Sequence, residues 1–434
     1  MDDMERARTL FLVGIEQLQD EHFAAAADSF RACLALAPGR ASALDNLSVC
    51  LLGLNQFTEA EAACRESLLA DAQSPTPWFN LGLVQRKMDQ LPLALASLQK
   101  AIELDPKFAD SWHQSGVMLN MQKRHPEAIS CFETVLELEP GHVEAMCVMA
   151  ASQAELKFYV SAQAVLEKAI AIAPDHPLPF TQLGHLHLSR KRPDEAIAFY
   201  RLALERNPAD RETVAYSLAA LTGETLPDTA PKDYVASLFD GYAENFESHL
   251  VDKLAYKTPQ TLYAQMKPLL GSALDIMDLG CGTGLMGQLV KDHAARLVGL
   301  DLSRRMLDEA GKKGIYDLLV CGDINDVLAH REDVYDVVMA ADVMIYLGDL
   351  SETFALVHRH LRSGGLFAFS VEGYDGDGFH LNPSKRYSHS PAYLQQLAQE
   401  HGFAVQSLAH DFLRLEATAP DGKITGYYAV LQKP

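Results

Sequence analysis

Residues 278–284 have the sequence DLGCGTG, and this stretch decides how the second half of the chain folds. An apolar run precedes it and a helical pattern follows it, so it predicts a tight turn from a β-strand into a helix. Glycines remove side chains from such a turn and allow the backbone to approach a ligand closely. The N-terminus of the following helix favours a negatively charged group. The stretch therefore predicts a loop that holds the anionic end of a small ligand.

The spacing of the glycines separates this loop from a dinucleotide-binding fingerprint. A G-x-G-x-x-G pattern would need its third glycine at the position of Leu285. The glycines are instead Gly280, Gly282 and Gly284, and Asp278 precedes the first of them by two residues.

Short apolar runs alternate with helical patterns through this half of the chain. Strands separated by helices of about a dozen residues predict a parallel sheet that is covered on both faces. The last two runs have no helix between them and predict an antiparallel hairpin at the edge of the sheet. The seven predicted strands span residues 273–279, 296–300, 318–321, 335–340, 366–371, 404–412 and 424–431.

Acidic residues end the second predicted strand and follow the third. Asp301 ends the second strand, where a carboxylate can accept hydrogen bonds from both ribose hydroxyls of a nucleoside. Asp323 follows the third strand, between Gly322 and Ile324. Each of these two acids has an alternative role as a helix N-cap. Because parallel strands share one carboxyl edge, we predict that Asp278, Asp301 and Asp323 line a single pocket.

The D-x-G-x-G-x-G form within this strand pattern resembles the first motif of class I methyltransferases, which use S-adenosylmethionine. The resemblance implies an α/β Rossmann-like domain whose seven-stranded sheet is mostly parallel and ends in an antiparallel edge hairpin. It implies that the three acids serve the methionine end, the ribose and the adenine of the cofactor. Apolar side chains would cover the adenine, one backbone group would meet the cofactor amine, and a tyrosine would close over the methionine end. The implied cofactor-binding residues are Tyr242, Asp278, Gly280, Cys281, Gly282, Gly284, Asp301, Leu302, Met306, Asp323, Ile324 and Ala340.

A fixed period of 34 residues runs through the first half of the chain. Small residues recur on this grid at Ala26, Ala60, Ala94, Ala128, Ala162 and Ala196. Prolines recur at Pro38, Pro106, Pro140, Pro174 and Pro208. Small residues let two helices approach closely, and a proline ends the second helix of a pair. Such pairs cannot bury their apolar faces alone and therefore stack.

This grid resembles the tetratricopeptide repeat, in about six copies over residues 7–210 with a capping helix behind them. The predicted organisation is an α-superhelical repeat array over residues 1–221, a linker over 222–233 and a methyltransferase domain over 234–434. Further residues, among them the segment 341–348, resemble a bacterial group of predicted methyltransferases that carry these repeats.

Repeat arrays of this kind usually bind peptides or proteins on a concave face. Four carboxamides share one grid position on the first helices of repeats: Asn46, Asn80, Gln114 and Gln182. A carboxamide both donates and accepts hydrogen bonds, so a ladder of them could pair with the backbone of an extended peptide. The alternative is a set of solvated polar residues.

Charge and composition limit the other partners. The formal net charge of −21 offers no basic surface for a phosphate backbone, so nucleic acid is not expected as a partner. No run of about 18 apolar residues predicts a membrane span, and the acidic N-terminus does not resemble a secretory signal. The seven cysteines have no C-x-x-C pair or metal-ligand spacing. We expect a cytoplasmic protein without a metal site.

The methyl acceptor is the least determined feature of the sequence. Asp342, Tyr346 and His389 are the candidate catalytic residues, since they should lie near the carboxyl ends of the strands. His389 could act as a base because imidazole titrates near neutrality, although a lone loop histidine is more often structural. The segment 373–389 could be a lid, a substrate wall or a surface loop.

Three functions remain open from the sequence. The first is methylation of a protein or a partner-delivered substrate that the repeats recognise. The second is methylation of a small molecule or lipid, with the repeats used for assembly. The third is an inactive scaffold, against which the intact acids and glycines of the predicted pocket count.

Overall fold

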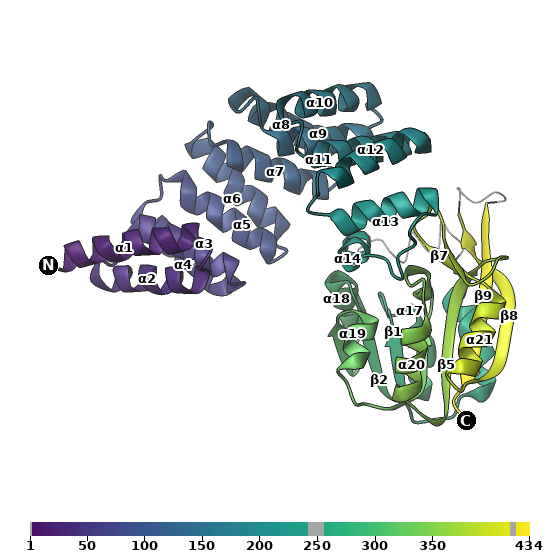
Figure 1. Cartoon of the computed structure of the whole chain (residues 1–434). Helices are drawn as coiled ribbons and strands as arrows, with labels where there is room; N and C mark the ends of the chain where they lie inside the picture. The colour runs from purple at the N-terminus through teal and green to yellow at the C-terminus, as the bar shows by residue number, and fades with distance from the viewer. Residues whose placement is uncertain (1, 242–255, 417–421) are drawn as a thin grey trace. The chain divides into compact units, whose positions relative to one another are not determined.

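The computed structural model describes residues 2–241, 256–416 and 422–434, and its contacts divide the chain into two compact units, residues 1–206 and 207–434. Figure 1 shows that the first unit is helical and that the second contains a sheet between helices. Within these described ranges, no helix is long and apolar enough to cross a membrane. Tyr242 lies outside the described residues.

The first unit consists of helix pairs that pack against one another in chain order, as the 34-residue period predicts. The helices are α1 (Asp3–Gln19), α2 (Phe23–Leu36), α3 (Ala41–Gly53), α4 (Phe57–Ala70), α5 (Pro75–Lys87), α6 (Leu91–Leu104), α7 (Ala109–Met121), α8 (His125–Leu138), α9 (Val143–Glu155), α10 (Tyr159–Ile172), α11 (Leu178–Ser189) and α12 (Pro193–Glu205).

The repeated small residues have the packing role that the sequence predicts. All six alanines of the grid are fully buried. On the first helix of a pair, a Cβ added to Gly116 would lie 2.8 Å from the Phe132 ring, and one added to Gly184 would overlap the Tyr200 ring. Each pair turns through a residue with φ between 58° and 63°, namely Glu21, Asn55, Asp89, Lys123, Lys157 and Lys191, again 34 residues apart.

The second unit contains one sheet with the strand order β3-β2-β1-β4-β5-β7-β6, and β9 and β8 extend it from the other edge of β5. The strands β1 to β5 are parallel, and β9 pairs antiparallel with both β5 and β8. The strands are β1 (Leu274–Leu279), β2 (Ala294–Asp301), β3 (Leu318–Cys321), β4 (Tyr335–Ala340), β5 (Leu361–Gly373), β6 (Phe379–Leu381), β7 (Tyr387–His389), β8 (Ala404–Leu415) and β9 (Lys423–Gln432).

Helices cover both faces of this sheet, because alternate residues of each parallel strand are apolar on opposite faces. Met277 of β1 belongs to the core under α20 and α21, while Ile276 belongs to the core under α16 and α17. The helices of this unit are α13 (Arg211–Thr222), α14 (Lys232–Asp240), α16 (Thr258–Met266), α17 (Leu285–Val290), α18 (Arg304–Lys312), α19 (Ile324–Ala329), α20 (Ser351–His360) and α21 (Pro391–Glu400), with the short 3-10 turn η5 (Met344–Tyr346).

The sheet differs from the predicted seven strands by one added hairpin. The seven predicted strands are present, and β6 and β7 come from the segment 373–389. Phe369 of β5 pairs with β4 on one edge and β9 on the other, whereas Glu372 pairs with β7 and β9. The hairpin therefore continues the sheet beyond the end of β4. Its strands are only three residues long, too short to show a periodic sequence pattern.

The division into compact units falls before α13, the helix that the sequence predicts as the cap of the array. The compact units divide after Arg206, and α13 belongs to the second one. Tyr216 and Ala220 on α13 pack in one cluster with Ile345 and Tyr387, and the Tyr216 hydroxyl donates to the Lys385 carbonyl at 2.8 Å. The periodicity of α13 resembles that of a repeat helix, but its apolar face packs against the sheet domain.

Candidate active site

A cavity lies at the carboxyl ends of β1, β2 and β4, where the sequence predicts a pocket. Of the predicted cofactor residues, Asp278, Gly280, Cys281, Gly282, Asp301, Leu302, Asp323 and Ile324 line it. Met306 is buried in α18, and neither it nor Gly284 nor Ala340 lines the cavity; Ala341, next in the chain, does.

The glycine loop needs two of its glycines for physical reasons that the structure shows. Gly280 has φ +61°, and a Cβ there would overlap the side chain of Val343. Gly284 has φ +91° at the start of α17, and a Cβ there would lie 3.0 Å from the Tyr316 ring. Substitutions at either position would be strained because side chains disfavour this backbone region. The loop thus needs glycine at both positions because its backbone packs closely against Val343 and Tyr316.

Asp278 is a buried carboxyl group at the base of the loop. Its side chain is 1% exposed and accepts a 2.7 Å hydrogen bond from the Tyr316 hydroxyl. Burial raises the pKa of Asp278 to about 7, although the bond from Tyr316 opposes this rise. A positively charged group entering the cavity would restore the carboxylate. This fits the prediction that Asp278 serves the amino-acid end of S-adenosylmethionine.

Asp301 supports the loop as well as the cavity. One carboxylate oxygen accepts the Gly282 amide at 2.8 Å, and the other accepts the Ser303 amide at 2.8 Å. Burial raises the pKa of Asp301, and these backbone hydrogen bonds lower it. Each carboxylate oxygen has a second lone pair for a ribose hydroxyl.

Asp323 has both of the roles that the sequence left open. Its side chain caps α19 by accepting the amides of Asn325 and Asp326 at 3.1 Å, and it also lines the cavity. Lys232 lies 3.5 Å from it and reaches Asp326 at 2.5 Å. The three acids thus lie at the ends of neighbouring strands, as predicted.

The predicted linker forms one wall of the cavity. Thr229 pairs with Leu347 as an isolated β-bridge, and the Ala230 amide donates to the Tyr346 carbonyl at 2.9 Å. Thr229, Ala230 and Lys232 all line the cavity. The residues 222–233 are therefore part of the second unit and of its site.

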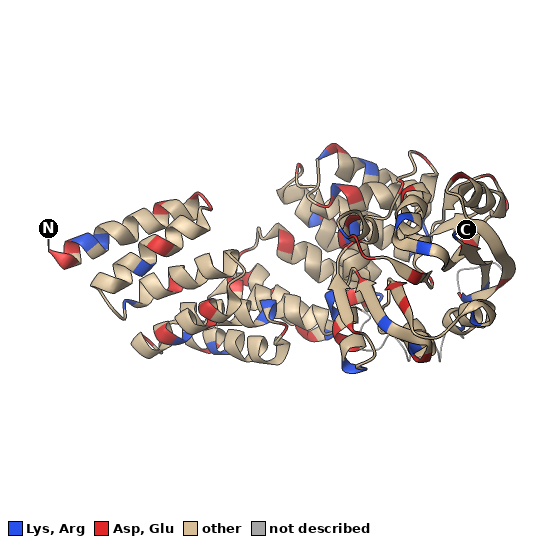
Figure 2. Ribbon diagram, turned by 90° about the horizontal axis from the view of Figure 1, so that it is seen from below, with Lys and Arg blue, Asp and Glu red and all other residues tan. Residues whose placement is uncertain are grey.

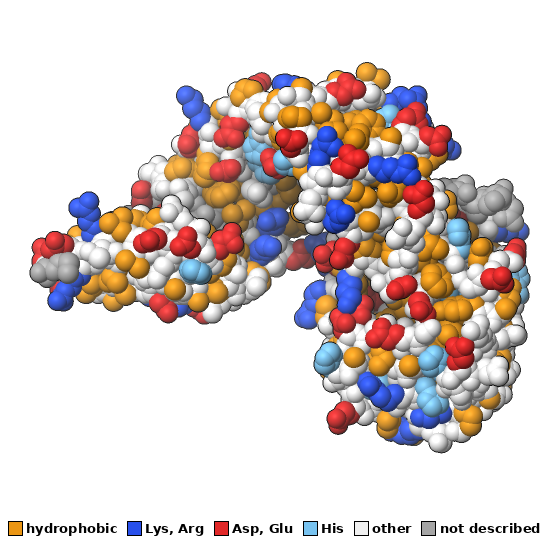
Figure 3. All heavy atoms as spheres, in the orientation of Figure 1, with side chains coloured by type: hydrophobic (Ala, Val, Ile, Leu, Met, Phe, Trp, Pro, Cys, Tyr) orange, Lys and Arg blue, Asp and Glu red, His pale blue; other side chains and the backbone are white. Residues whose placement is uncertain are grey.

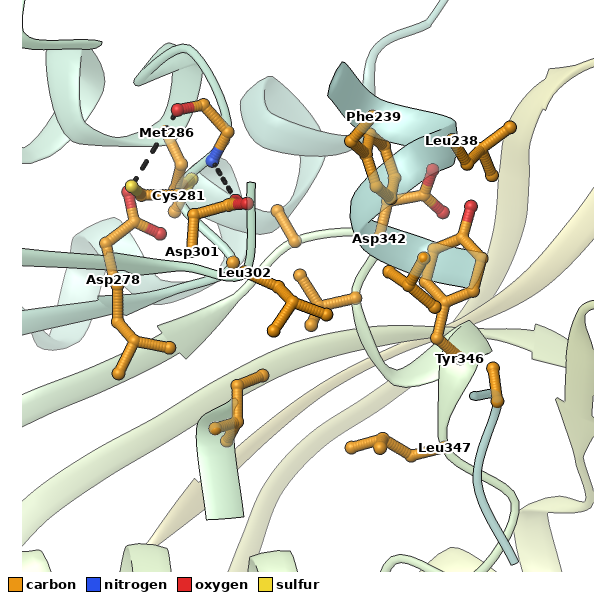
Figure 4. Close-up of a pocket in the computed structure, with 18 of the residues that line it drawn as sticks. Leu238, Phe239, Asp278, Cys281, Met286, Asp301, Leu302, Asp342, Tyr346 and Leu347 are labelled. Atoms are coloured by element: carbon orange, nitrogen blue, oxygen red, sulfur yellow. Dashed lines mark hydrogen bonds between the residues drawn. The ribbon is translucent and has the colours of Figure 1, made fainter. Parts of the chain in front are cut away.

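The helix α14 follows this wall and covers the cavity with Leu238 and Phe239 (Figure 4). The Phe239 ring meets the Tyr346 ring edge-on, at 5.5 Å between centroids. At the end of α14, Asp240 accepts the Ser303 hydroxyl at 2.5 Å. Val235 and Phe239 are spaced i, i+4, a pattern that indicates an apolar helix face, but only the fold decides which surface this face covers.

Of the predicted catalytic residues, Asp342 and Tyr346 line the cavity and His389 does not. His389 is fully buried, and its Nε2 lies 3.0 Å from the Gly348 carbonyl. Burial lowers the pKa of His389 to about 4. The structure therefore removes the support for His389 as a base, because its ring is enclosed under the β6–β7 hairpin.

Two arginines line the cavity near Asp342, and the sequence did not predict them as site residues. Arg386 precedes β7 and Arg414 lies near the end of β8, and both line the cavity. Arg414 is 2% exposed and contacts the carboxylates of Asp342 and Glu372. A motif search would not select them, since arginines on edge strands are usually solvated.

The residues present fit S-adenosylmethionine. The glycine loop, which lines the cavity at Gly280 and Gly282, lies beside a buried acid for the amino-acid end, and two further acids follow towards the nucleoside end. The fit requires no residue outside the cavity lining.

The four carboxamides of the repeat unit have different surroundings. Asn80 is 5% exposed and donates to the Asp45 carbonyl at 3.2 Å and the Ser48 hydroxyl at 3.1 Å, so it joins neighbouring repeats. Asn46 donates to the Ser42 carbonyl at 2.7 Å within its own helix. Gln114 and Gln182 are half-buried.

The surface of the repeat unit mixes charge and apolar groups. Lys and Arg alternate with Asp and Glu along its helices (Figure 2). Apolar side chains reach its surface between them (Figure 3), and the strongly exposed ones include Leu69, Leu93 and Val160.

Comparisons with known proteins agree with these two architectures. Residues 277–369 match the family described as a methyltransferase domain. Residues 14–75, 75–108, 97–130 and 154–221 match tetratricopeptide repeat families.

Curated relatives match about a third of the chain. The chain is 26% identical over 167 residues to malonyl-[acyl-carrier protein] O-methyltransferase of Priestia megaterium, covering 38% of this chain and 59% of that protein. It is 31% identical over 147 residues to the protein of that name from Halalkalibacterium halodurans, covering 32% and 52%. The chain thus spans little more than half of the length of these relatives.

Among solved structures, a tetratricopeptide repeat protein from Parabacteroides merdae is 14% identical, with a TM-score of 0.45, and the match covers 54% of this chain and 91% of that one. The family matches and the two folds agree: tetratricopeptide repeats lie in the first half of the chain, and a domain with a class I methyltransferase fold contains residues 277–369.

Proposed function

We propose that the chain is an S-adenosylmethionine-dependent methyltransferase whose repeats recruit a protein or a substrate delivered by a protein partner. The observation that carries the proposal is the glycine cradle with Asp278, Asp301 and Asp323 on three successive strand ends. The intact set counts against an inactive scaffold, above all because of Asp278, whose burial costs free energy unless a cationic ligand group pairs with it.

S-Adenosylmethionine, when bound, supplies a methyl group that is already activated on a positively charged sulfur. The protein needs to align an acceptor with this group and to exclude water. Asp301 and Asp323 would orient the nucleoside, and Asp278 would hold the amino-acid end. Leu238 and Phe239 cover the cavity and would keep water from it.

The names of the relatives favour a second candidate acceptor. They describe enzymes that methylate a malonyl group carried by an acyl carrier protein. A small acid attached to a carrier is also a partner-delivered substrate, so this candidate shares the recruiting role of the repeats. The two candidates differ in the chemistry of the accepting atom.

Calorimetric titration of the full chain with S-adenosylmethionine and S-adenosylhomocysteine tests the cofactor. We expect dissociation constants in the micromolar range, or about −8 kcal/mol. Clean, folded protein that binds neither compound would leave the scaffold as the better explanation.

Changing Gln114 and Gln182 together to alanine tests the repeats. If the half-buried carboxamides pair with a bound peptide, the double variant should capture its partner from cell extract about tenfold less well than wild type. Asn80 is left unchanged because its amide joins neighbouring repeats and its loss would weaken the array itself.

The exposed Gln73 serves as the matched control, and its change to alanine should leave capture intact. Equal capture by the double variant and wild type, with equal melting temperatures, would remove the carboxamide ladder from the proposal.

A further inference from the structure

Five charged residues meet at the end of the cavity that is far from the nucleoside acids. We call them the acceptor-end cluster: Asp342, Glu372, Arg386, Arg414 and Glu416. Asp342 lies in the loop after β4, and Glu372 lies in β5. Arg386 immediately precedes β7. Arg414 lies near the end of β8, and Glu416 follows that strand. The adenine and ribose acids follow β3 and β2, on the other side of β1 in the sheet order. If a nucleoside binds between Asp301 and Asp323, the reacting end of the cofactor and the methyl acceptor would lie beside this cluster.

The two guanidinium groups of the cluster are already paired. Arg414 contacts Asp342 at 3.2 Å, Glu416 at 3.3 Å and also Glu372, while Arg386 donates to Glu416 at 2.6 Å. Three carboxylates face two guanidinium groups, so the cluster has one negative charge in excess when all five are ionised. Tyr256 and Tyr346, which also line this end, stay neutral because burial raises the pKa of both hydroxyls.

Asp342 is the carboxylate of the cluster that lines the cavity. Arg414 donates a hydrogen bond to Asp342 Oδ1. The backbone amide of Asp342 donates to the Ser370 hydroxyl at 2.9 Å. Its φ of +61° lies in the left-handed region, which aspartate tolerates better than most residues. Figure 4 shows its side chain near Tyr346 and Phe239, on the cavity side.

We infer that the acceptor is an amine, oriented by a hydrogen bond from its nitrogen to Asp342, with Arg414 as the residue that positions Asp342. This inference rests on the proposed methyltransferase function and names its substrate class. Among the described residues that line the cavity, the cations are Lys232, Arg386 and Arg414, and each already faces a carboxylate. A carboxylate acceptor would therefore meet the excess negative charge of the cluster with no unpaired cation from these residues. An amine gains an acceptor for its N–H. Its nitrogen would bond to the methyl carbon as the bond from that carbon to sulfur breaks, which leaves neutral S-adenosylhomocysteine, and Asp342 Oδ2 can take the proton that the nitrogen gives up before this proton passes to water.

A binding experiment tests the inference without turnover. Sinefungin has an amine where S-adenosylmethionine has its S-methyl group, and S-adenosylhomocysteine has neither. For the full wild-type chain, we expect calorimetry to show sinefungin binding about tenfold more tightly than S-adenosylhomocysteine. For Asp342→Asn, the two constants should become equal, because the amide no longer attracts the amine.

The variant should fold, since asparagine tolerates the left-handed backbone of position 342. Thermal melting checks this. Asp323→Asn is the matched control at the adenine end, and it should weaken both ligands equally and leave their ratio unchanged. Arg414→Lys keeps the charge but loses the fork of donors, and it should reduce the ratio only in part.

The outcomes distinguish a failure of the proposed methyltransferase function from a failure of the inferred amine acceptor. If wild type binds neither ligand, the methyltransferase function fails. If both ligands bind and Asp342→Asn keeps the wild-type ratio, only the amine inference is overturned.

The chemical nature of the product gives a second, independent test. Full-length protein is incubated with tritiated S-adenosylmethionine and cell extract, and separately with malonyl-loaded acyl carrier protein. We expect label that resists mild alkali and that elutes with N-methylated amine standards after acid hydrolysis. Label released as volatile methanol, or methylation of the malonyl carrier, would show a methyl ester and overturn the inference. If no label is incorporated, the binding ratio decides.

Discussion

Replacing Asp301 by alanine is expected to weaken S-adenosylmethionine binding at least about 100-fold and to lower the free energy of unfolding by about 2–4 kcal/mol. The carboxylate is 8% exposed and accepts the amides of Gly282 and Ser303, each at 2.8 Å. Its removal leaves two amides at the cavity without their acceptor and also removes the predicted ribose ligand. Calorimetry measures the change in cofactor affinity. Denaturant unfolding, followed through the transition of the second unit, measures the change in the free energy of unfolding.

Asp308→Ala is the control for this variant. Asp308 is an exposed acid on α18 that faces Arg304 at 3.4 Å, so its loss should change neither quantity appreciably. A variant at Asp301 with full cofactor affinity would contradict the assignment of this acid to the ribose. An unchanged unfolding free energy would contradict its role in supporting the glycine loop.

Replacing Asp278 by asparagine is expected to stabilise the protein at pH 8 by about 2–4 kcal/mol while weakening cofactor binding about tenfold or more. Burial raises the pKa of this carboxyl from 3.8 to about 7 in the folded protein. Between about pH 4 and pH 7, the Asp278 carboxyl has lost its proton in the unfolded chain but still binds it in the folded chain. The stability of wild type therefore falls as the pH rises from about 4 to 7, and the asparagine variant lacks this loss.

The pH dependence distinguishes this effect from a general change in packing. The difference in the free energy of unfolding between variant and wild type should reach its largest value above pH 7 and should vanish towards pH 4. Asparagine can still bond to the Tyr316 hydroxyl, which meets the carboxyl at 2.7 Å. Asp292→Asn, at an exposed acid on the same unit, should show no such trend. A constant difference across the range would contradict a raised pKa at Asp278.

Two of the predicted cofactor acids also have structural roles. Asp301 holds the loop, and Asp323 caps α19. Asp278 destabilises the fold at neutral pH, and this cost is understandable if a cationic ligand group restores its charge. Helix capping and ligand binding were alternatives in the sequence, but the same carboxylate can do both because it has several lone pairs.

Local and periodic features of the sequence determined a large part of this protein. The 34-residue grid predicted the helix pairs, since packing between adjacent helices repeats with the chain. The DLGCGTG stretch predicted the turn from β1 into α17, since glycines with positive φ have a local cause. The acids at strand ends predicted one wall of the cavity, since parallel strands bring their carboxyl ends to one edge.

The tertiary structure alone decided the other side of the cavity. Arg414 meets Asp342 across 72 residues of chain, and Asp240 meets Ser303 across 63. The residues 222–233 resembled a linker by composition but form a wall, and α13 resembled a repeat helix but packs on the sheet domain. His389 resembled a base until its burial was known. Such contacts join segments that are distant in sequence, so no local pattern or period records them, and only the packed chain determines which surfaces meet.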